Sequence, residues 1–272
     1  MSLTVAQKLL SAYLLLLVIF WVFLQQSGLQ TSFWNYFYSF AFSLIPLLGG
    51  IYGLFLAKPW GFLDSSIGRA ICYISLGLFS WGVGSMIWSY YNFFERLAAP
   101  YPSVADVGFI AAIPLWIVGV VNLSQATGVR FALQNIKGKL FLLIVPILIF
   151  IVSYYLLVYV ARGGVISEST DDLMKLFFDF AYPIGDVAIL ALATVILGLS
   201  LNYFGGLFKV PIIALLAGFG VMYLADFVFS YTTTIETFYN GNFGDLLFTL
   251  ALFLMTFGVL GFNNLKGESG DK

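Results

Sequence analysis

The chain has 272 residues, of which 61% are hydrophobic and only 9% are charged. A soluble domain is about half apolar and about a quarter charged, so the composition excludes an ordinary water-soluble domain and favours an integral membrane protein. A net charge of −1 gives no basic surface for nucleic acid, and the absence of histidine with a single cysteine, Cys72, excludes histidine-based metal or haem sites and a disulfide framework.

Eight apolar segments succeed one another along the chain, each long enough to cross about 30 Å of hydrocarbon as a helix. In lipid the backbone must satisfy its own hydrogen bonds, so each segment is predicted to be helical. The expected spans are 8–25, 33–57, 67–94, 103–123, 140–160, 176–201, 210–232 and 243–262. The first is expected to be retained, because no small-residue cleavage site comes after it. The predicted fold is an all-α bundle of about eight transmembrane helices in one domain over 1–263, with a short cytoplasmic tail at 264–272.

The lysines and arginines predict the orientation, because cytoplasmic loops are enriched in both. With the N-terminus in the cytoplasm, nine basic residues fall inside: Lys8, Lys58, Arg69, Arg130, Lys137, Lys139, Lys209, Lys266 and Lys272. Three fall outside: Arg96, Arg162 and Lys175. The acidic residues Glu95, Glu168, Asp171, Asp172 and Glu236 fall outside too. An even number of spans then places the C-terminus in the cytoplasm.

The two halves of the chain resemble each other. Three pairs recur at nearly constant offsets: Asp106 with Asp245 and Gly119 with Gly258, both at 139, and Pro46 with Pro183 at 137. These pairs indicate a parallel internal repeat of four spans per half, 8–123 and 140–263. Transporters are built from repeats of this kind, although a repeat alone does not decide function.

Six residues in or at the edges of spans are candidates for ligand binding: Asp186, Asp226, Asp179, Tyr182, Asp106 and Asp245. Two of the acids have a structural alternative. Ser103 and Asn242 each precede an acid by three residues, which is the spacing of a helix capping box. Asp106 and Asp245 are therefore either caps at the outer ends of their spans or ligand-binding groups.

One face of the sixth span is polar. Asp179, Tyr182, Pro183 and Asp186 are spaced to share that face. Pro183 removes a backbone hydrogen bond and is expected to kink the span and free a carbonyl toward the bundle. Asp186 is the deepest acid, roughly 16 Å from the interface at 1.5 Å per residue, with no basic residue expected at that depth. Asp186 and Asp226 are therefore expected to have one of two roles. They bind a ligand or an ion, or they are protonated and hydrogen-bond to neighbouring helices.

Eight aromatic residues gather at the outer ends of the predicted spans. They are Trp34, Tyr36, Trp88, Tyr90, Tyr91, Tyr101, Tyr231 and Tyr239. Tryptophan and tyrosine are enriched at both membrane interfaces, so these residues are predicted to form an aromatic belt. Alternatively, a few of them line a pocket that opens outward above the carboxylates.

Several short motifs occur in a characteristic order between about residues 50 and 263. They are Gly82-x-Gly84 with Trp88, then 100–106 (PYPSVAD), 182–186 (YPIGD), 224–226 (LAD) and 244–247 (GDLL). In this respect the chain resembles the N-terminal multi-spanning sensory region found ahead of bacterial diguanylate cyclase and phosphodiesterase domains. The resemblance implies a membrane-embedded input module that relays a signal through its last helix to a cytoplasmic partner.

The sequence departs from that family after the last span. Family members continue into a soluble signalling domain, whereas this sequence continues only through 263–272, too few residues to fold. The chain is therefore expected to be a stand-alone module or a fragment. The resemblance assigns no ligand to any residue, and the sequence leaves any cofactor unknown.

Three functions are compatible with these patterns. The first is a sensory or ligand-binding module in the cell membrane that signals to a cytoplasmic partner. The second is a small transporter or channel that uses buried carboxylates. The third is a structural subunit of a larger membrane complex. No enzyme activity is expected, because Gly185-Asp186 and Gly244-Asp245 both lack the preceding glycine of intramembrane aspartyl proteases.

Overall fold

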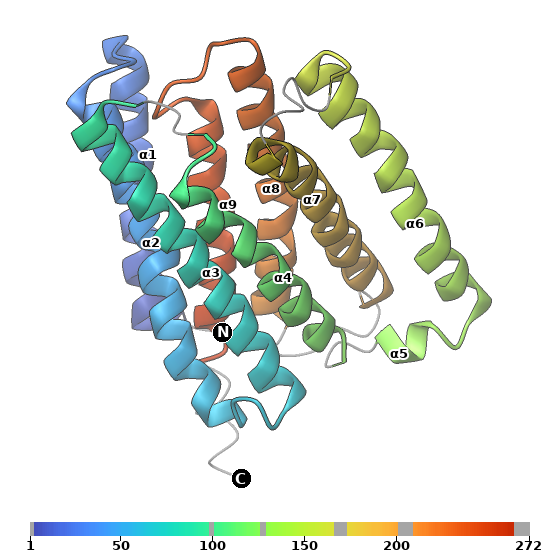
Figure 1. Cartoon of the computed structure of the whole chain (residues 1–272). Coiled ribbons are helices and arrows are strands. Elements are labelled where there is room, and N and C mark those ends of the chain that lie inside the picture. The colour runs from blue at the N-terminus through green and yellow to red at the C-terminus, as the bar shows by residue number, and fades with distance from the viewer. Residues whose placement is uncertain (1–2, 98–100, 126–128, 166–172, 201–208, 264–272) are drawn as a thin grey trace.

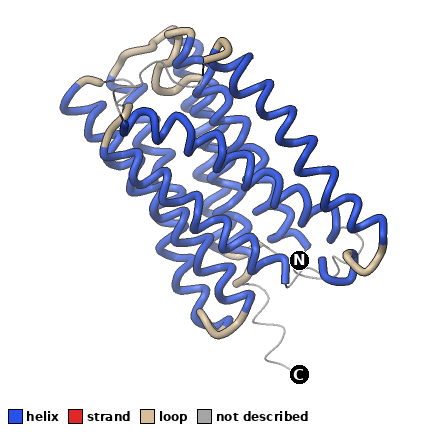
Figure 2. Tube along the Cα trace, turned by 45° about the vertical axis from the view of Figure 1, so that its right-hand side comes forward, coloured by secondary structure: helices blue, strands red, loops and turns tan. Residues whose placement is uncertain are grey.

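The structure is a computed structural model that describes residues 3–97, 101–125, 129–165, 173–200 and 209–263. Figures 1 and 2 show that these residues form helices and the loops between them, with no strand in the ranges described. The predicted all-α class is therefore confirmed.

The helices agree with the predicted spans in order and number. In chain order they are α1 (Val5–Ser27), α2 (Phe33–Ala57), η1 (Lys58–Trp60), α3 (Ser66–Tyr90), η2 (Tyr91–Glu95), α4 (Val104–Gln125), α5 (Val129–Ala132), α6 (Ile136–Tyr154), η3 (Tyr155–Val160), α7 (Leu173–Ser200), α8 (Lys209–Thr234) and α9 (Phe243–Gly261). Eight of them, counted with the turns that continue α2, α3 and α6, are long and apolar enough to cross a membrane. This architecture supports a multi-pass membrane protein. The sequence did not predict α5 or the π-helical turns η2 and η3.

Polar residues fix where several helices begin. The Thr4 hydroxyl accepts a hydrogen bond from the Gln7 backbone N–H at 3.0 Å, and the Gln7 side chain accepts one from the Thr4 N–H at 3.1 Å. Ser32 and Asn35 form the same reciprocal box at the start of α2. Such caps satisfy N–H groups that the first helical turn leaves without partners.

The start of the first helix and the end of the last helix lie at the same end of the bundle. The Gln7 side chain donates to the Phe257 carbonyl at 3.2 Å, so the start of α1 lies beside the end of α9. We call this the terminal end, and we call the opposite end, where α1, α3, α6 and α8 finish, the distal end (Figure 1). That the terminal end faces the cytoplasm stays a prediction from the basic residues. Some of the charged residues on which this prediction rests lie outside the described residues: Lys266, Lys272, Glu168, Asp171 and Asp172. The tail 264–272 lies outside them too.

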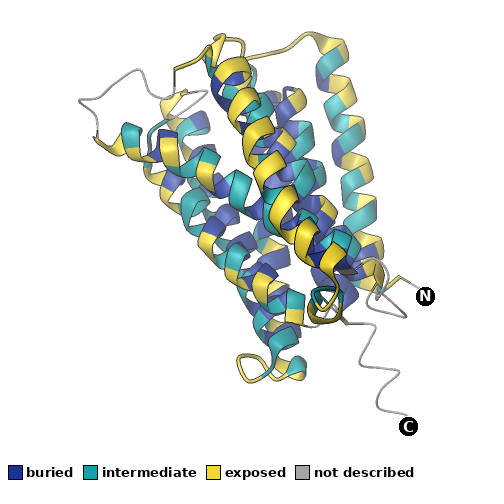
Figure 3. Ribbon diagram, turned by 90° about the vertical axis from the view of Figure 1, so that its right-hand side faces the viewer, coloured by how far each residue is buried: buried dark blue, intermediate teal, exposed yellow. Residues whose placement is uncertain are grey.

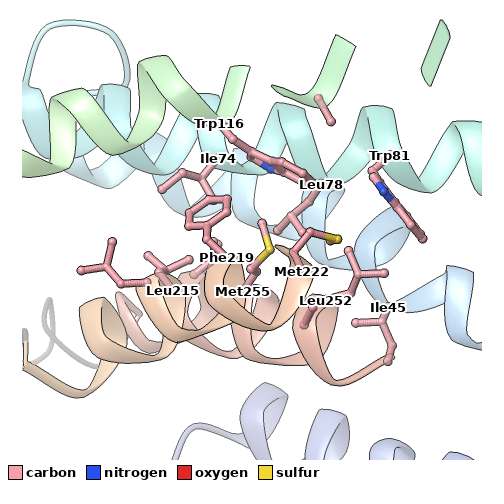
Figure 4. Packing of buried hydrophobic residues seen from close by; sticks show 14 of the residues in the cluster. Ile45, Ile74, Leu78, Trp81, Trp116, Leu215, Phe219, Met222, Leu252 and Met255 are labelled. Atoms are coloured by element: carbon pink, nitrogen blue, oxygen red, sulfur yellow. The ribbon is translucent and has the colours of Figure 1, made fainter. Parts of the chain in front are cut away.

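A dense apolar core joins both halves of the chain. Figure 4 shows side chains of α3 and α4 meeting those of α8 and α9. The rings of Trp116 in α4 and Phe219 in α8 pack edge to face, with centroids 5.7 Å apart. Leu78 and Leu252 are completely buried in the same cluster. Large interlocked side chains of this kind close the middle of the bundle.

The outer helices are much less covered. In α1 and α6 only 11% of the most apolar stretch is buried within the protein. Figure 3, viewed from the side of α6, shows exposed residues along most of the helix nearest the viewer. Helix α6 packs mainly on α7, where Phe141 fills the space beside Gly198. The apolar outer faces suit contact with lipid.

Glycine permits the closest helix crossings. A Cβ added at Gly258 of α9 would lie 2.7 Å from the Pro211 carbonyl oxygen and 3.0 Å from the Leu215 backbone nitrogen of α8. A Cβ added at Gly119 of α4 would likewise lie 3.0 Å from the backbone nitrogen of Ile74 in α3. The two members of this predicted repeat pair therefore have similar packing roles, while the repeat itself stays a prediction.

We expect Gly258→Ala to lower the free energy of unfolding by about 1–3 kcal/mol, because the methyl group would press on the α8 backbone. Gly220→Ala in α8 is the matched control, since a Cβ there meets nothing within 4 Å. It should leave stability unchanged or slightly improved. Thermal unfolding in detergent, monitored by tryptophan fluorescence, measures both. Equal stability of the two variants would contradict the close crossing.

Candidate ligand-binding cavity

A cavity of about 430 Å³ extends from the distal end into the middle of the bundle. Its walls come from α2, α3, α4, α7, α8 and α9, together with residues just beyond α6. All six residues that the sequence singled out line it: Asp106, Asp179, Tyr182, Asp186, Asp226 and Asp245. The fold therefore gathers residues that are up to 139 positions apart in the sequence around one space.

The deepest polar feature is a pair of carboxyl groups. Asp186 of α7 and Asp226 of α8 are hydrogen-bonded to each other. Two ionised carboxylates contain no hydrogen to share, so this bond requires a proton on one of them. Asp186 lies 13 residues after the start of α7, about 20 Å along the helix axis. The pair therefore lies well inside the bundle.

Arg162 is a cavity residue that the sequence did not predict. It was expected in an outer loop, and no basic side chain was expected near Asp186. In the structure its Nε donates to the Ser230 hydroxyl at 3.1 Å, and its Nη1 donates to the Asp179 carbonyl oxygen at 2.8 Å. The Asp179 carboxylate lies 3.9 Å from Nη1, and the guanidinium also attracts the Asp186 carboxyl group electrostatically.

Pro183 explains why the Asp179 carbonyl is available. In an α-helix the N–H of residue 183 would bond to the carbonyl of residue 179, and proline has no N–H. The carbonyl freed by Pro183 accepts the Arg162 hydrogen bond instead. The sequence predicted a freed carbonyl facing the bundle but gave no sign of its partner, because that partner comes from a different part of the chain.

Two tyrosines bridge α7 to the region where α4 begins. The Tyr182 hydroxyl donates to the Asp106 carboxylate at 2.8 Å, and the Tyr101 hydroxyl donates to the Asp179 carboxylate at 2.7 Å. Burial raises the pKa of the Tyr101 phenol above its ordinary value, and the hydrogen bond to Asp179 raises it further. Tyr101 therefore stays protonated at neutral pH and acts as a donor.

The predicted contact between acid and cap residue forms at Asp106, and at Asp245 the acid bonds instead to the residue before the cap. Asp106 accepts from the Ser103 N–H at 2.7 Å. Asp245 accepts from the Gly241 N–H at 2.6 Å, while the Asn242 side chain accepts from the Asp245 N–H at 3.1 Å. Both acids also line the cavity, so a structural role and a place at the site coexist in the same side chains.

The remaining wall is largely aromatic. The rings of Trp81 and Phe109 lie 5.0 Å apart, and Trp88 packs against Phe229 with centroids 6.0 Å apart. Of the eight aromatic residues expected at the outer ends of spans, Trp88 and Tyr101 line the cavity. Among the exposed aromatics are Trp34, Tyr90 and Tyr231, as an interfacial belt requires. The cavity aromatics that sequence reasoning missed, such as Trp81 and Trp116, lie inside their spans.

The lining contains more acidic than basic residues. Six acidic and two basic residues of the described chain contribute to it, the two bases being Arg162 and Lys175. Glu236 is an acid that the sequence placed in an outer loop without a role. No cluster of three or more acidic, cysteine or histidine side chains suited to a metal ion occurs in the described part. The lining therefore combines net acidity with aromatic surface.

The Arg162 contact can be tested through its dependence on Pro183. Arg162→Gln should lower the free energy of unfolding by about 1.5–3 kcal/mol, the range for hydrogen bonds to charged groups. In a Pro183→Ala background the loss should be smaller, because the substituted alanine supplies its own N–H to the Asp179 carbonyl. A double-mutant cycle by thermal unfolding measures the difference. Strictly additive losses would show that the two residues act independently.

The cap at the start of α9 predicts a difference between two substitutions at one position. Asp245→Ala removes the acceptor for the Gly241 N–H and should cost about 1 kcal/mol. Asp245→Asn keeps an acceptor oxygen and should fold with close to wild-type stability. Thermal unfolding of both variants tests the cap, and an Asp245→Ala variant as stable as wild type would refute it.

No protein-family model matches the chain, and neither the curated proteins nor the solved structures contain a match. The resemblance to bacterial sensory regions therefore remains an expectation from short motifs. The function of the chain must be inferred from the geometry of its own cavity.

Proposed function

We propose that this chain is a sensory module of the cell membrane that binds a small ligand in the distal cavity and signals to a cytoplasmic partner. The observation that carries the proposal is the convergence of all six candidate residues, with Arg162, on one cavity. Most ligand sites are largely preformed concavities that combine apolar walls with a few convergent polar groups. This cavity has both features.

The position of the cavity favours binding over conduction. Its deep part ends at Trp116 and Phe219, which pack against each other. Beyond them, toward the terminal end, fully buried residues such as Leu215 of α8 and Val259 of α9 fill the space between the two helices. A ligand that enters from the distal end meets a closed floor.

The walls also supply a route for a signal. A ligand held between α7 and α8 would contact two helices that meet through the Asp186–Asp226 hydrogen bond. Helix α8 packs closely along α9, the last helix, through Gly218 and Gly258. A shift of α8 would therefore reach the terminal end through α9. The cytoplasmic location of that end and the identity of a partner rest on the basic residues and on the family resemblance.

A small transporter is the second candidate. The buried carboxyl pair beside a helix-interrupting proline favours it, since intramembrane acids often mark ion or substrate pathways. Transport differs from sensing in one measurable respect. A transporter accumulates its ligand in vesicles, whereas a sensor binds the ligand and leaves its concentration unchanged on both sides.

Cysteine labelling tests whether the cavity can be reached. Thr233 lines it near the distal end, so Thr233→Cys should react rapidly with a small, charged thiol reagent in nanodiscs. The wild-type chain is the matched control, because its one thiol, Cys72, is buried and should stay unreacted. Compounds that bind in the cavity should slow the reaction. An unreactive Thr233→Cys variant would contradict a ligand site open to solution.

The same compounds decide between the two candidates. For a sensor, a protecting compound should change the distance between spin labels at Lys58→Cys and Asn263→Cys, in a Cys72→Ser background, and should not accumulate in proteoliposomes. Accumulation that disappears in Asp186→Asn would support the transporter.

A further inference from the structure

The chemistry of the cavity points to a class of ligand. The site has more acidic than basic groups, and Arg162 is already engaged by Ser230 and Asp179. Asp106 and Asp245 are occupied as caps. The Asp186–Asp226 pair is the deepest acidic group, both of its members line the cavity, and a hydrogen bond between two carboxyl groups needs a proton on one of them. Among the described residues of the lining, this pair joins two carboxyl groups directly, so a cationic ligand can be bound there by both.

A protonated primary amine matches this pair. Its ammonium group carries one positive charge and three N–H donors, so it can donate to both carboxylates at once and replace the shared proton. Charge-assisted hydrogen bonds of this kind are short and strong. A bare metal ion prefers more oxygen ligands than two carboxyl groups provide, and no larger acidic cluster occurs in the described ranges.

The surroundings of the pair fit an apolar body on the amine. One turn away on α8 lies Phe229, and one turn away on α7 lies Tyr182, both lining the cavity. Trp81, Trp88 and Trp116 line it as well. Aromatic faces attract cations and also cover apolar surface. At about 430 Å³ the cavity holds more than an ammonium ion alone.

We propose that the cavity binds a protonated primary amine with an aromatic or similarly bulky apolar body, whose ammonium group takes the place of the proton shared by Asp186 and Asp226. This inference rests on the proposed function in taking the cavity as a ligand site. It adds the class of ligand and the two residues that hold its charge.

Binding by this exchange releases one proton for each amine bound. The other ionisable groups that line the cavity are Tyr101, Asp106, Arg162, Lys175, Asp179, Tyr182, Tyr223, Glu236 and Asp245. Their hydrogen bonds to one another, such as Tyr182 with Asp106, do not depend on the ammonium group. While the pair holds its proton, affinity should therefore rise about tenfold per pH unit.

The test uses three compounds of one shape and different charge: phenethylamine, the neutral phenethyl alcohol and the anionic hydrocinnamate. Each is titrated calorimetrically into the full chain in nanodiscs. We expect phenethylamine to bind at least tenfold more tightly than the other two. Repeating the titration in buffers of different ionisation enthalpy should give about one proton released per amine bound.

Three variants make the test specific. Asp186→Asn and Asp226→Asn should each weaken phenethylamine binding at least tenfold, and an asparagine can still hydrogen-bond to the remaining carboxyl group, so the fold is kept. Asp64→Asn is the matched control, because it removes the same charge from an exposed loop at the terminal end. It should bind like wild type.

The outcomes separate this inference from the proposed function. Equal amine binding by all variants would mean partition into the bilayer and would overturn the inference. Tighter binding of the alcohol or of the anion, or amine binding without proton release, would overturn it too and leave the cavity as a site for another ligand. If none of the three compounds binds while Thr233→Cys still reacts, the inference alone fails. If Thr233→Cys is also unreactive, the proposed function fails with it.

Discussion

The Arg162 side chain is the contact on which the polar interior depends. Pro183 leaves the Asp179 carbonyl without a partner inside a helix, where an unsatisfied polar group costs several kcal/mol in hydrocarbon. Arg162 supplies the missing donor, balances the Asp179 carboxylate and reaches Ser230 of α8. One side chain thereby links the end of the α6–η3 segment to α7 and α8, and it places a positive charge near the deep carboxyl pair.

The features that the sequence could predict were local. Hydropathy and length located eight spans, and the predicted 33–57 coincides with α2. The spacing of Ser103 with Asp106 and of Asn242 with Asp245 predicted caps, which form between residues only three apart in the chain. The shared face of Asp179, Tyr182 and Asp186 follows from helix geometry alone, and all three line the cavity.

The features that the sequence could not predict depend on contacts between distant segments. The sequence around Arg162 predicts an ordinary charged loop residue, because nothing near it in the chain indicates that its guanidinium lies in the cavity. The hydrogen bond between Asp186 and Asp226 joins α7 to α8, and the two acids lie 40 residues apart in the chain. The π-helical turns η2 and η3 contain no proline or glycine that would have indicated them. Asp106 and Asp245 both cap helices and line the cavity, so one acid can have a structural role and a place at the site. The spacing in the sequence had offered these two roles as alternatives.

The isolation of α6 has a consequence for how the cavity responds to its surroundings. This helix is anchored chiefly on α7, through Phe141 beside Gly198, and at its far end through the hydrogen bond between Ser153 and Tyr223. Its remaining faces are apolar and uncovered, and the chain carries Arg162 just beyond it. A thinner or thicker bilayer changes the tilt of such a helix at little cost. A change in membrane thickness would therefore act on the Arg162 guanidinium and, through its hydrogen bonds, on α7 and α8.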